Sequence, residues 1–116
     1  MNSMELDISA KVEGGYSIVS VKGEIDLYSS TMLREYMLTT MKQRPPRGLI
    51  VELAEVSYID SSGIATMVEG LQLANKSAIK FKVAGLSPRV LEVFELMRLE
   101  QVFDIYDSVE EALNSA

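Results

Sequence analysis

Apolar and polar residues alternate at the start of the chain. Apolar side chains stand at every second position over residues 6–12, and the pattern resumes over residues 19–25 with polar or charged residues between them. A period of two is typical of a strand with one buried face. Because Gly14-Gly15 lies between the two segments and suits a tight turn, the pattern predicts an antiparallel hairpin.

The apolar spacing then changes to three and four residues, which is typical of one face of a helix. This face consists of Leu33, Tyr36, Met37, Thr40 and Met41. Ser29 or Ser30 can cap the start of the helix. The prolines of RPPRG end it, because proline does not fit a helix interior and also restricts the residue before it.

Further strands and helices follow this first helix. The run LIVEL, residues 49–53, suits a strand buried on both faces. Apolar residues then recur at helical spacing from Ile64 to about Lys76. The segment AIKFKVAG, residues 78–85, predicts another strand whose buried face consists of Ile79, Phe81 and Val83.

The C-terminal part of the sequence predicts two more helices. In LSPRVLEVFELM, residues 86–97, Ser87 is placed to cap the helix and Pro88 lies in its first turn. The residues expected to point inward are Val90, Leu91, Phe94 and Met97. After a short extended piece, Ser108 and Glu111 have the spacing of a capping box for a final helix.

The order of these elements predicts the fold class. Strands that alternate with helices pair in parallel through right-handed crossovers, whereas the first two strands form the hairpin. We therefore expect an α/β fold, a small mixed sheet of about four to five strands with about four helices packed on it. At 116 residues, the whole chain, residues 1–116, is expected to form a single domain.

Composition and charge exclude several functional classes. A net charge of −6 repels nucleic acid, so none is expected as a ligand. The absence of cysteine excludes a disulfide scaffold, and the absence of histidine removes the base of Ser-His-Asp relays and a common zinc ligand. No apolar run has the length of a signal peptide or a bilayer span, so we expect a cytoplasmic protein without direct membrane insertion.

The sequence carries no motif for catalysis or cofactor binding. It has neither a glycine-rich phosphate loop ending in Lys-Ser or Lys-Thr nor a G-x-G-x-x-G segment. Asp26 and Asp60 alone do not make a hard-cation site, which needs further oxygen ligands. We therefore predict no enzyme activity, no catalytic residue, no cofactor and no metal.

Polar residues follow each of the expected parallel strands. Asp26 comes after the second strand, the segment 60–62 with the sequence Asp-Ser-Ser after the third, and Ser87 with Arg89 after the fourth. Open α/β sheets usually meet ligands and partners at the carboxyl ends of their parallel strands. We therefore expect these residues to gather at one end of the molecule.

Ser61 stands at the expected start of a helix, and two interpretations of it remain open. A phosphate on Ser61 would be well placed there, because free backbone N–H groups and the helix dipole favour negative charge. Asp, Ser and Gly are also the residues that a helix start prefers for capping alone, and Asp26 has a parallel interpretation as a turn former.

The motifs of this region resemble those of the STAS-domain anti-sigma factor antagonists of bacteria. VKGEIDLYSS is similar to the family's G-E-[IL]-D segment, LIVELAEVSYIDSSGIA to its strand and D-S-[ST]-G signature, and VAGLSPRVLEVFELMRLEQVFDIYDSVEEAL to its C-terminal half. The resemblance covers nearly the whole chain. The sequence departs from it at Ile64-Ala65-Thr66, where many family members have Leu-Gly.

The resemblance implies a partner switch controlled by phosphorylation. In this family a serine kinase that is also the anti-sigma factor binds the unphosphorylated antagonist, and phosphorylation of the serine after the aspartate releases it. The matching position here is Ser61, with Ser62 as the runner-up, and a serine phosphatase would restore the binding form. Asp26 corresponds to the family's acid in the neighbouring loop, and Asp60 to the acid before the serine.

The expected partner-binding surface is built around the second helix. It consists of Asp26, Asp60, Ser62, Gly63, Ile64, Ala65, Met67 and Ser87. One alternative is a STAS accessory subunit of a bacterial lipid-transport ABC system that docks on its ATPase, and another is a regulator with a different output. A small nucleotide-binding or nucleotide-hydrolysing protein is a third. Association with an ATPase regardless of Ser61 phosphorylation would favour the accessory subunit. Binding of GTP or ATP would favour the nucleotide-binding protein.

Overall fold

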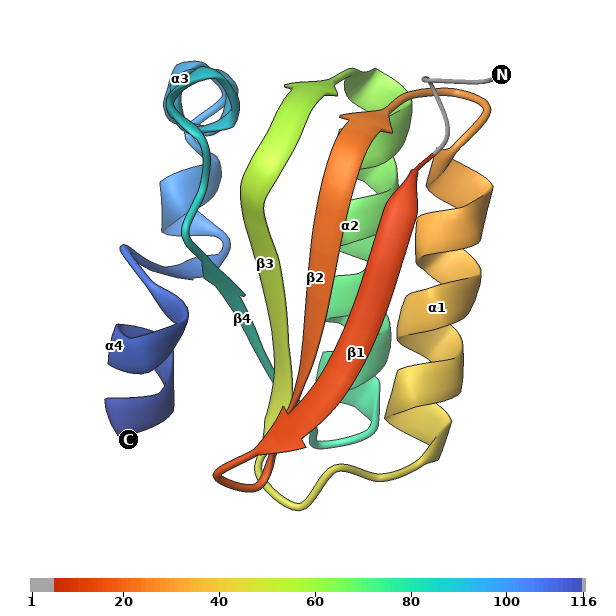
Figure 1. The fold of residues 1–116 in the computed structure, drawn as a ribbon, viewed down its shortest axis with the longest axis vertical. Coiled ribbons are helices and arrows are strands. Elements are labelled where there is room, and N and C mark those ends of the chain that lie inside the picture. The colour runs from red at the N-terminus through yellow and green to blue at the C-terminus, as the bar shows by residue number, and fades with distance from the viewer. Residues whose placement is uncertain (1–5, 116) are drawn as a thin grey trace.

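A five-stranded sheet runs through the molecule, with helices on both of its faces (Figure 1). The computed structural model describes residues 6–115, so residues 1–5 and 116 of the predicted 1–116 domain lie outside the described residues. The strands are β1 (Asp7–Glu13), β2 (Tyr16–Ile25), β3 (Gly48–Ile59), β4 (Lys80–Ala84) and β5 (Asp104–Tyr106). The helices are α1 (Ser30–Lys42), α2 (Ser61–Lys76), α3 (Pro88–Leu96) and α4 (Val109–Asn114), with a short 3-10 helix η1 (Leu99–Gln101).

The sheet is mixed, which confirms the predicted α/β fold class. β1 is antiparallel to β2 in the hairpin, and the other neighbouring strands are parallel. The strand order follows the sequence from β1 to β5. The carboxyl ends of β2, β3 and β4 therefore share one edge of the sheet, and β2 and β3 end at the top of Figure 1 beside the start of α2.

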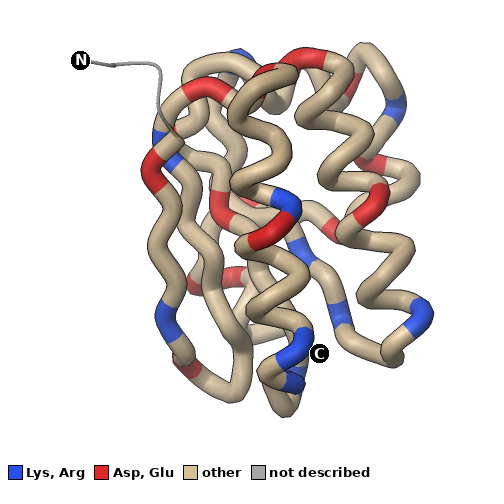
Figure 2. Tube along the Cα trace, turned by 90° about the vertical axis from the view of Figure 1, so that its right-hand side faces the viewer, with Lys and Arg blue, Asp and Glu red and all other residues tan. Residues whose placement is uncertain are grey.

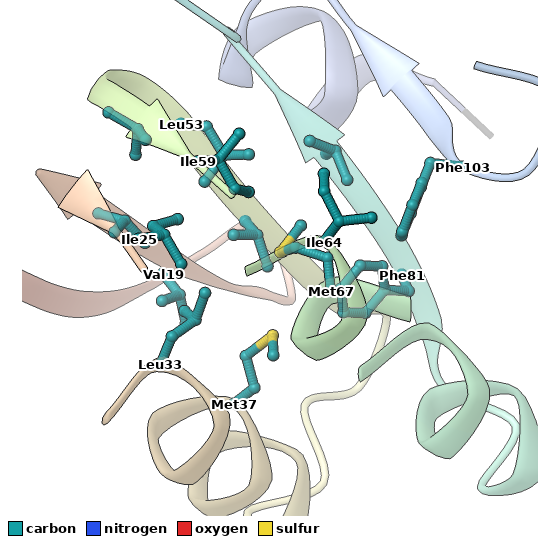
Figure 3. Close-up of a cluster of buried hydrophobic side chains, with 14 of the residues drawn as sticks. Val19, Ile25, Leu33, Met37, Leu53, Ile59, Ile64, Met67, Phe81 and Phe103 are labelled. Carbon is teal, nitrogen blue, oxygen red and sulfur yellow. The ribbon is translucent and has the colours of Figure 1, made fainter. Parts of the chain in front are cut away.

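Helices α1 and α2 lie on one face of the sheet and cover the main core (Figures 1 and 3). Leu33 and Met37 of α1 and Met67 of α2 are essentially inaccessible to solvent. A smaller cluster on the opposite face lies under α4 and consists of Tyr16, Ile18, Ile50, Ala84 and Ala112. Neighbouring residues such as Ile18 and Val19 belong to different clusters, as expected for a strand buried on both faces.

The first and third strands differ from the sequence prediction. β3 runs to Ile59 rather than ending at residue 53, because the long strand β2 supplies pairing partners as far as Ile25. β1 is an edge strand, and α1 packs over β2 and β3 instead. Consequently only Ile8 of β1 is half-buried, while Val12 is 72% exposed.

Helix α3 buries a narrower face than predicted. Val90 and Phe94 are fully buried, but Leu91 and Met97 are 37% and 53% exposed. The prediction that these two residues point inward is wrong, because the helix ends at Leu96 and presents only one narrow stripe to the core. Tyr36, which the sequence places on the buried face of α1, is also 37% exposed.

A buried lysine fastens the C-terminal helix to the sheet. Lys82 of β4 is 1% exposed, and its Nζ donates to the carbonyl oxygens of Ala112 at 2.8 Å and Ser115 at 3.1 Å. The ammonium also lies 4.8 Å and 5.0 Å from the ring centroids of Tyr16 and Tyr106. These cation–π and carbonyl contacts replace the water that the charge loses on burial.

None of the helices within residues 6–115 is long and apolar enough to cross a membrane.

Candidate functional site

The loops that follow β2, β3 and β4 lie at one edge of the sheet, as the sequence predicts. The backbone N–H of Asp60 donates to the carbonyl oxygen of Ile25 at 3.1 Å, which places the segments holding Asp26 and Asp60 side by side. The Ser87 hydroxyl donates to the carbonyl oxygen of Val56 at 2.6 Å and so ties the β4–α3 loop to β3. This edge, called the serine pole below, consists of Asp26, Asp60, Ser61, Ser62 and Ser87.

Asp60 is the N-cap of α2. Its backbone is extended, and its Oδ1 accepts the backbone N–H groups of Ser62 at 2.9 Å and Gly63 at 3.1 Å. These bonds satisfy helix-end donors that would otherwise have no partner. The capping interpretation of Asp60 is therefore confirmed.

We expect Asp60→Ala to lower the free energy of unfolding by about 1 kcal/mol, because the variant loses this cap. Asp60→Asn keeps a side-chain oxygen acceptor and should cost much less. Urea unfolding of the two variants measures the difference. If Asn proves as damaging as Ala, then the charge of Asp60, and not its hydrogen bonds, stabilises the helix.

Ser61 is the first residue of α2, and its side chain is exposed. Its hydroxyl forms no hydrogen bond with another residue in the part of the chain that the structure describes. Ser62 is half-buried, and its backbone N–H is used by the cap. Ser61 is therefore the more accessible of the two hydroxyls to a modifying enzyme.

Asp26 organises the loop between β2 and α1. Its Oδ1 accepts the backbone N–H groups of Tyr28 and Ser29, each at 2.9 Å. The Ser29 hydroxyl accepts the N–H of Asp26 at 2.9 Å and donates to the carbonyl oxygen of Glu24 at 2.6 Å. Ser29 occupies the N-cap position of α1, but its side chain makes no capping bond because the hydroxyl is engaged in this turn. The Ser30 hydroxyl donates to the carbonyl oxygen of Leu27 instead, so the prediction that Ser29 or Ser30 caps the helix is wrong.

The turn contacts keep Asp26 ionised. The backbone N–H of Ser29, together with the Ser29 hydroxyl and the Tyr28 N–H, lowers the pKa of Asp26 below its ordinary value of 3.8, although partial desolvation opposes them. Asp26 therefore keeps its negative charge to a lower pH than an ordinary aspartate, on a segment that lies beside the one holding Asp60.

We expect the carboxyl carbon of Asp26 to titrate by NMR with a midpoint below 3.8. A depressed folded-state pKa means that ionised Asp26 stabilises the fold above its unfolded-state pKa, and that this contribution is lost as the pH falls through the lowered value. The Ser29 hydroxyl also lies 3.1 Å from Oδ1 of Asp26 and helps to lower its pKa, so Ser29→Ala should raise the midpoint. A midpoint at or above 3.8 in the wild type would contradict the role given to the turn.

The structure divides the predicted partner-binding residues into surface and core. Asp26, Asp60, Ser62 and Ser87 are partly exposed, and Ala65 is exposed. Gly63, Ile64 and Met67 are buried instead. These three residues therefore do not form part of the exposed surface, contrary to the sequence prediction. They face the strands, as Figure 3 shows for Ile64 and Met67.

Exposed apolar residues at the serine pole were missed by the sequence interpretation. Leu27 and Tyr28 of the β2–α1 loop are 64% and 88% exposed, and Tyr58 at the end of β3 is 43% exposed. The signal was present in the segment DLYSS, where two large apolar residues occupy an otherwise polar loop. Exposed aromatic residues next to polar groups are typical of protein-binding surfaces.

Among the described residues, no group of three or more Asp and Glu residues is placed to hold a metal ion. The serine pole offers an exposed hydroxyl at the start of α2, two carboxylates, and apolar side chains on the neighbouring β2–α1 loop and β3. Together with the mixed sheet, these features define the class of protein as a small α/β domain.

The chain belongs to the STAS domain family, whose model matches residues 7–112. A relative named anti-sigma-B factor antagonist from Staphylococcus aureus is 32% identical over 107 residues, which cover 92% of this chain and 98% of the relative. Among solved structures, an anti-sigma factor antagonist from Mycobacterium paratuberculosis matches with a TM-score of 0.84 and 25% identity, covering 93% of this chain and 91% of that one. The fold is also that of the phosphorylated form of the Bacillus cell fate determinant SpoIIAA, with a TM-score of 0.70, 20% identity, and coverage of 93% and 97%.

Proposed function

We propose that this protein is a non-enzymatic partner-switching regulator, in which phosphorylation of Ser61 controls binding to an anti-sigma factor that is also a serine kinase. The observation that carries the proposal is the position of Ser61. Its hydroxyl is exposed at the first residue of α2, while the adjoining Asp60 supplies the cap. The cap of α2 therefore does not use the Ser61 hydroxyl, and this hydroxyl remains available for modification.

A phosphate on Ser61 would add a charge of roughly −1.5 to −2 to the serine pole. The N–H groups of Ser62 and Gly63 already bind the Asp60 carboxylate, so they do not neutralise the phosphate. The ionised Asp26 carboxylate adds further negative charge nearby. The modification thus leaves α2 intact but makes the surface strongly anionic, which a partner docked there would not tolerate.

The unphosphorylated surface offers apolar contacts around this serine. Leu27, Tyr28 and Tyr58 are exposed at the pole, and Ala65 follows one helical turn after Ser61. Exposed tyrosines bury much area on binding and are enriched among the residues that dominate binding energy. We infer that the kinase covers these side chains and that Gly63, Ile64 and Met67 support them from the core.

The rest of the regulatory cycle follows from the accessibility of the serine. A phosphate that points into solvent is open to a serine phosphatase, which would restore the binding form. The kinase supplies ATP and the catalytic base, so the regulator itself needs no cofactor, metal or catalytic residue. We propose that it acts in the cytoplasm as a single domain, without nucleic acid as a ligand and without insertion into a membrane.

A pull-down from native lysate, read by mass spectrometry, tests the proposal. Wild-type protein and Ser61→Ala should capture a serine kinase, and Ser61→Glu should lose it. Capture of an ABC-transporter ATPase by all three baits would overturn the proposal and favour the accessory-subunit alternative. Capture of the same kinase by all three would show that Ser61 does not control the interaction.

A further inference from the structure

The end of the molecule opposite the serine pole contains a groove between the C-terminal ends of α1 and α2. Its volume is about 660 Å³. Leu38, Leu73 and Ile79 form an apolar floor, and each is half-buried against the main core. The cationic residues Lys42 and Arg44 also line the groove.

All the charged residues that line this groove are cationic, although the protein as a whole carries a net charge of −6. Lys76, in the last turn of α2, lies next to the lining residue Ser77. Figure 2 shows several Lys and Arg segments at the lower end of the chain, where α1 and α2 end. Within residues 6–115, the ion pairs involve other cations, so the charges of Lys42, Arg44 and Lys76 are not neutralised by a neighbouring carboxylate.

The helix dipole explains only some of the positive charges at this groove. A lysine in the last turn of a helix is stabilised by the C-terminal carbonyl groups, which explains Lys42 and Lys76. Arg44 lies beyond the helix and has a φ of 54°, a left-handed conformation that favours glycine. The backbone thus favours glycine at this position, whereas the arginine side chain adds a positive charge to the groove.

We propose that this groove, formed by residues 38–46 and 73–79, docks an acidic, leucine-containing segment of a partner protein. The apolar side chains of the segment would cover Leu38, Leu73 and Ile79, and its carboxylates would pair with Lys42 and Arg44. Charge complementarity favours such an occupant, because the lining contains no acidic residue. The apolar floor gives it surface to bury.

A protein segment fits the groove better than an anionic membrane does. Membrane-surface binding requires apolar side chains that project into the lipid. Here the large apolar residues of the lining are partly or fully buried against the main core, and none of them is among the highly exposed hydrophobic side chains of the described chain. A convex or flat lipid surface would leave this floor uncovered.

The groove is separate from the serine pole. Helix α2 has 16 residues and joins the two ends of the molecule, so the two surfaces lie about 24 Å apart along its axis. The docking segment and the proposed kinase can therefore bind at the same time. Binding at the groove does not require Ser61 to be the phosphorylated residue.

Binding of a short synthetic peptide with alternating Leu and Glu residues tests the inference on the full chain. We expect its ¹H–¹⁵N chemical-shift changes to cluster within residues 38–46 and 73–79. Lys42→Glu with Arg44→Glu should weaken binding by at least about tenfold. A control with the same charge change elsewhere, Lys22→Glu with Arg98→Glu, and the variant Ser61→Glu should each stay within about twofold of the wild type.

The variant Arg44→Gly distinguishes loss of the positive charge from an effect on protein stability. Glycine relieves the left-handed backbone at this position, so the melting temperature should rise or stay constant while peptide affinity falls. Shift changes outside the groove, or no changes at millimolar peptide, would overturn the inference. Equal weakening of peptide binding by the control variant, Lys22→Glu with Arg98→Glu, would also overturn it. If vesicles of phosphatidylcholine and phosphatidylglycerol bind through Lys42 and Arg44 while the peptide does not, the groove is a lipid site and the inference is wrong.

Discussion

A Ser61→Ala variant is expected to bind the partner kinase as tightly as the wild type and to accept no phosphate from it. The Ser61 side chain is exposed and makes no hydrogen bond to another residue between 6 and 115, so its removal leaves the cap and the start of α2 unchanged. Incubation with the kinase and labelled ATP, followed by mapping of the modified residue, measures the loss. Persistent labelling of the variant at Ser62 would show that the assignment is wrong.

The matching variant Ser61→Glu should weaken kinase binding by roughly a hundredfold, equivalent to about 3 kcal/mol at 25 °C. The added carboxylate lies near Asp26 and Asp60, and the helix-end donors are already occupied by Asp60. Isothermal titration calorimetry with the purified kinase measures the change. Thr39→Glu is the matched control, because it adds the same charge to an exposed position of α1. A comparable loss for this control would indicate a general charge effect instead of a local switch.

Gly63→Ala is expected to destabilise the protein by about 2–3 kcal/mol and lower its melting temperature by roughly 10 °C. A Cβ at this position would lie 2.6 Å from Cγ1 of Ile59, 2.7 Å from Cγ2 of Ile25 and 3.0 Å from the carbonyl oxygen of Ile25. The backbone of β2 cannot move away as a side chain can, so the start of α2 must shift. Because Asp60 and Ser61 would shift with it, phosphorylation should also slow at temperatures where the variant is still folded.

Gly70→Ala is the control for this prediction, since it makes the same change in the same helix. Its Cβ would lie 3.0 Å from both Sδ and Cε of Met37, a flexible side chain that can adjust, and 3.2 Å from Cε2 of Phe81. Within a helix, alanine is also about 1 kcal/mol more favourable than glycine, and this gain offsets the crowding. Thermal and urea unfolding should therefore show a much smaller effect at residue 70. Equal losses at both glycines would contradict the special role of the contact with β2.

Short-range patterns in the sequence predicted much of the fold and of the serine pole. Asp60, Ser87 and Ser108 each accept a backbone N–H three residues ahead, so their capping roles can be read from local sequence. The hairpin follows in the same way from the alternation around Gly14 and Gly15. In such cases the interacting groups are neighbours in the chain, and their spacing determines the contact.

What the sequence did not reveal depends on partners far along the chain. The length of β3 is determined by pairing with β2, and the burial of Met67 by the packing of α2 on the sheet. The Ser29 hydroxyl is taken by Glu24 and Asp26 rather than by its own helix. Likewise, the cationic groove appears only when the ends of α1 and α2 meet in space, because its residues lie in segments 38–46 and 73–79.

The lysine that fastens α4 also has a consequence for folding during synthesis. Lys82 leaves the ribosome well before Ala112 and Ser115, whose carbonyl oxygens accept its hydrogen bonds. Until those residues emerge, the face of β4 that α4 later covers is open to water, so Lys82 stays hydrated and β4 can join the sheet without burying an unpaired charge. We therefore expect the nascent chain to form its sheet first, and α4 to dock afterwards, when the carbonyl oxygens of Ala112 and Ser115 replace the water around Lys82.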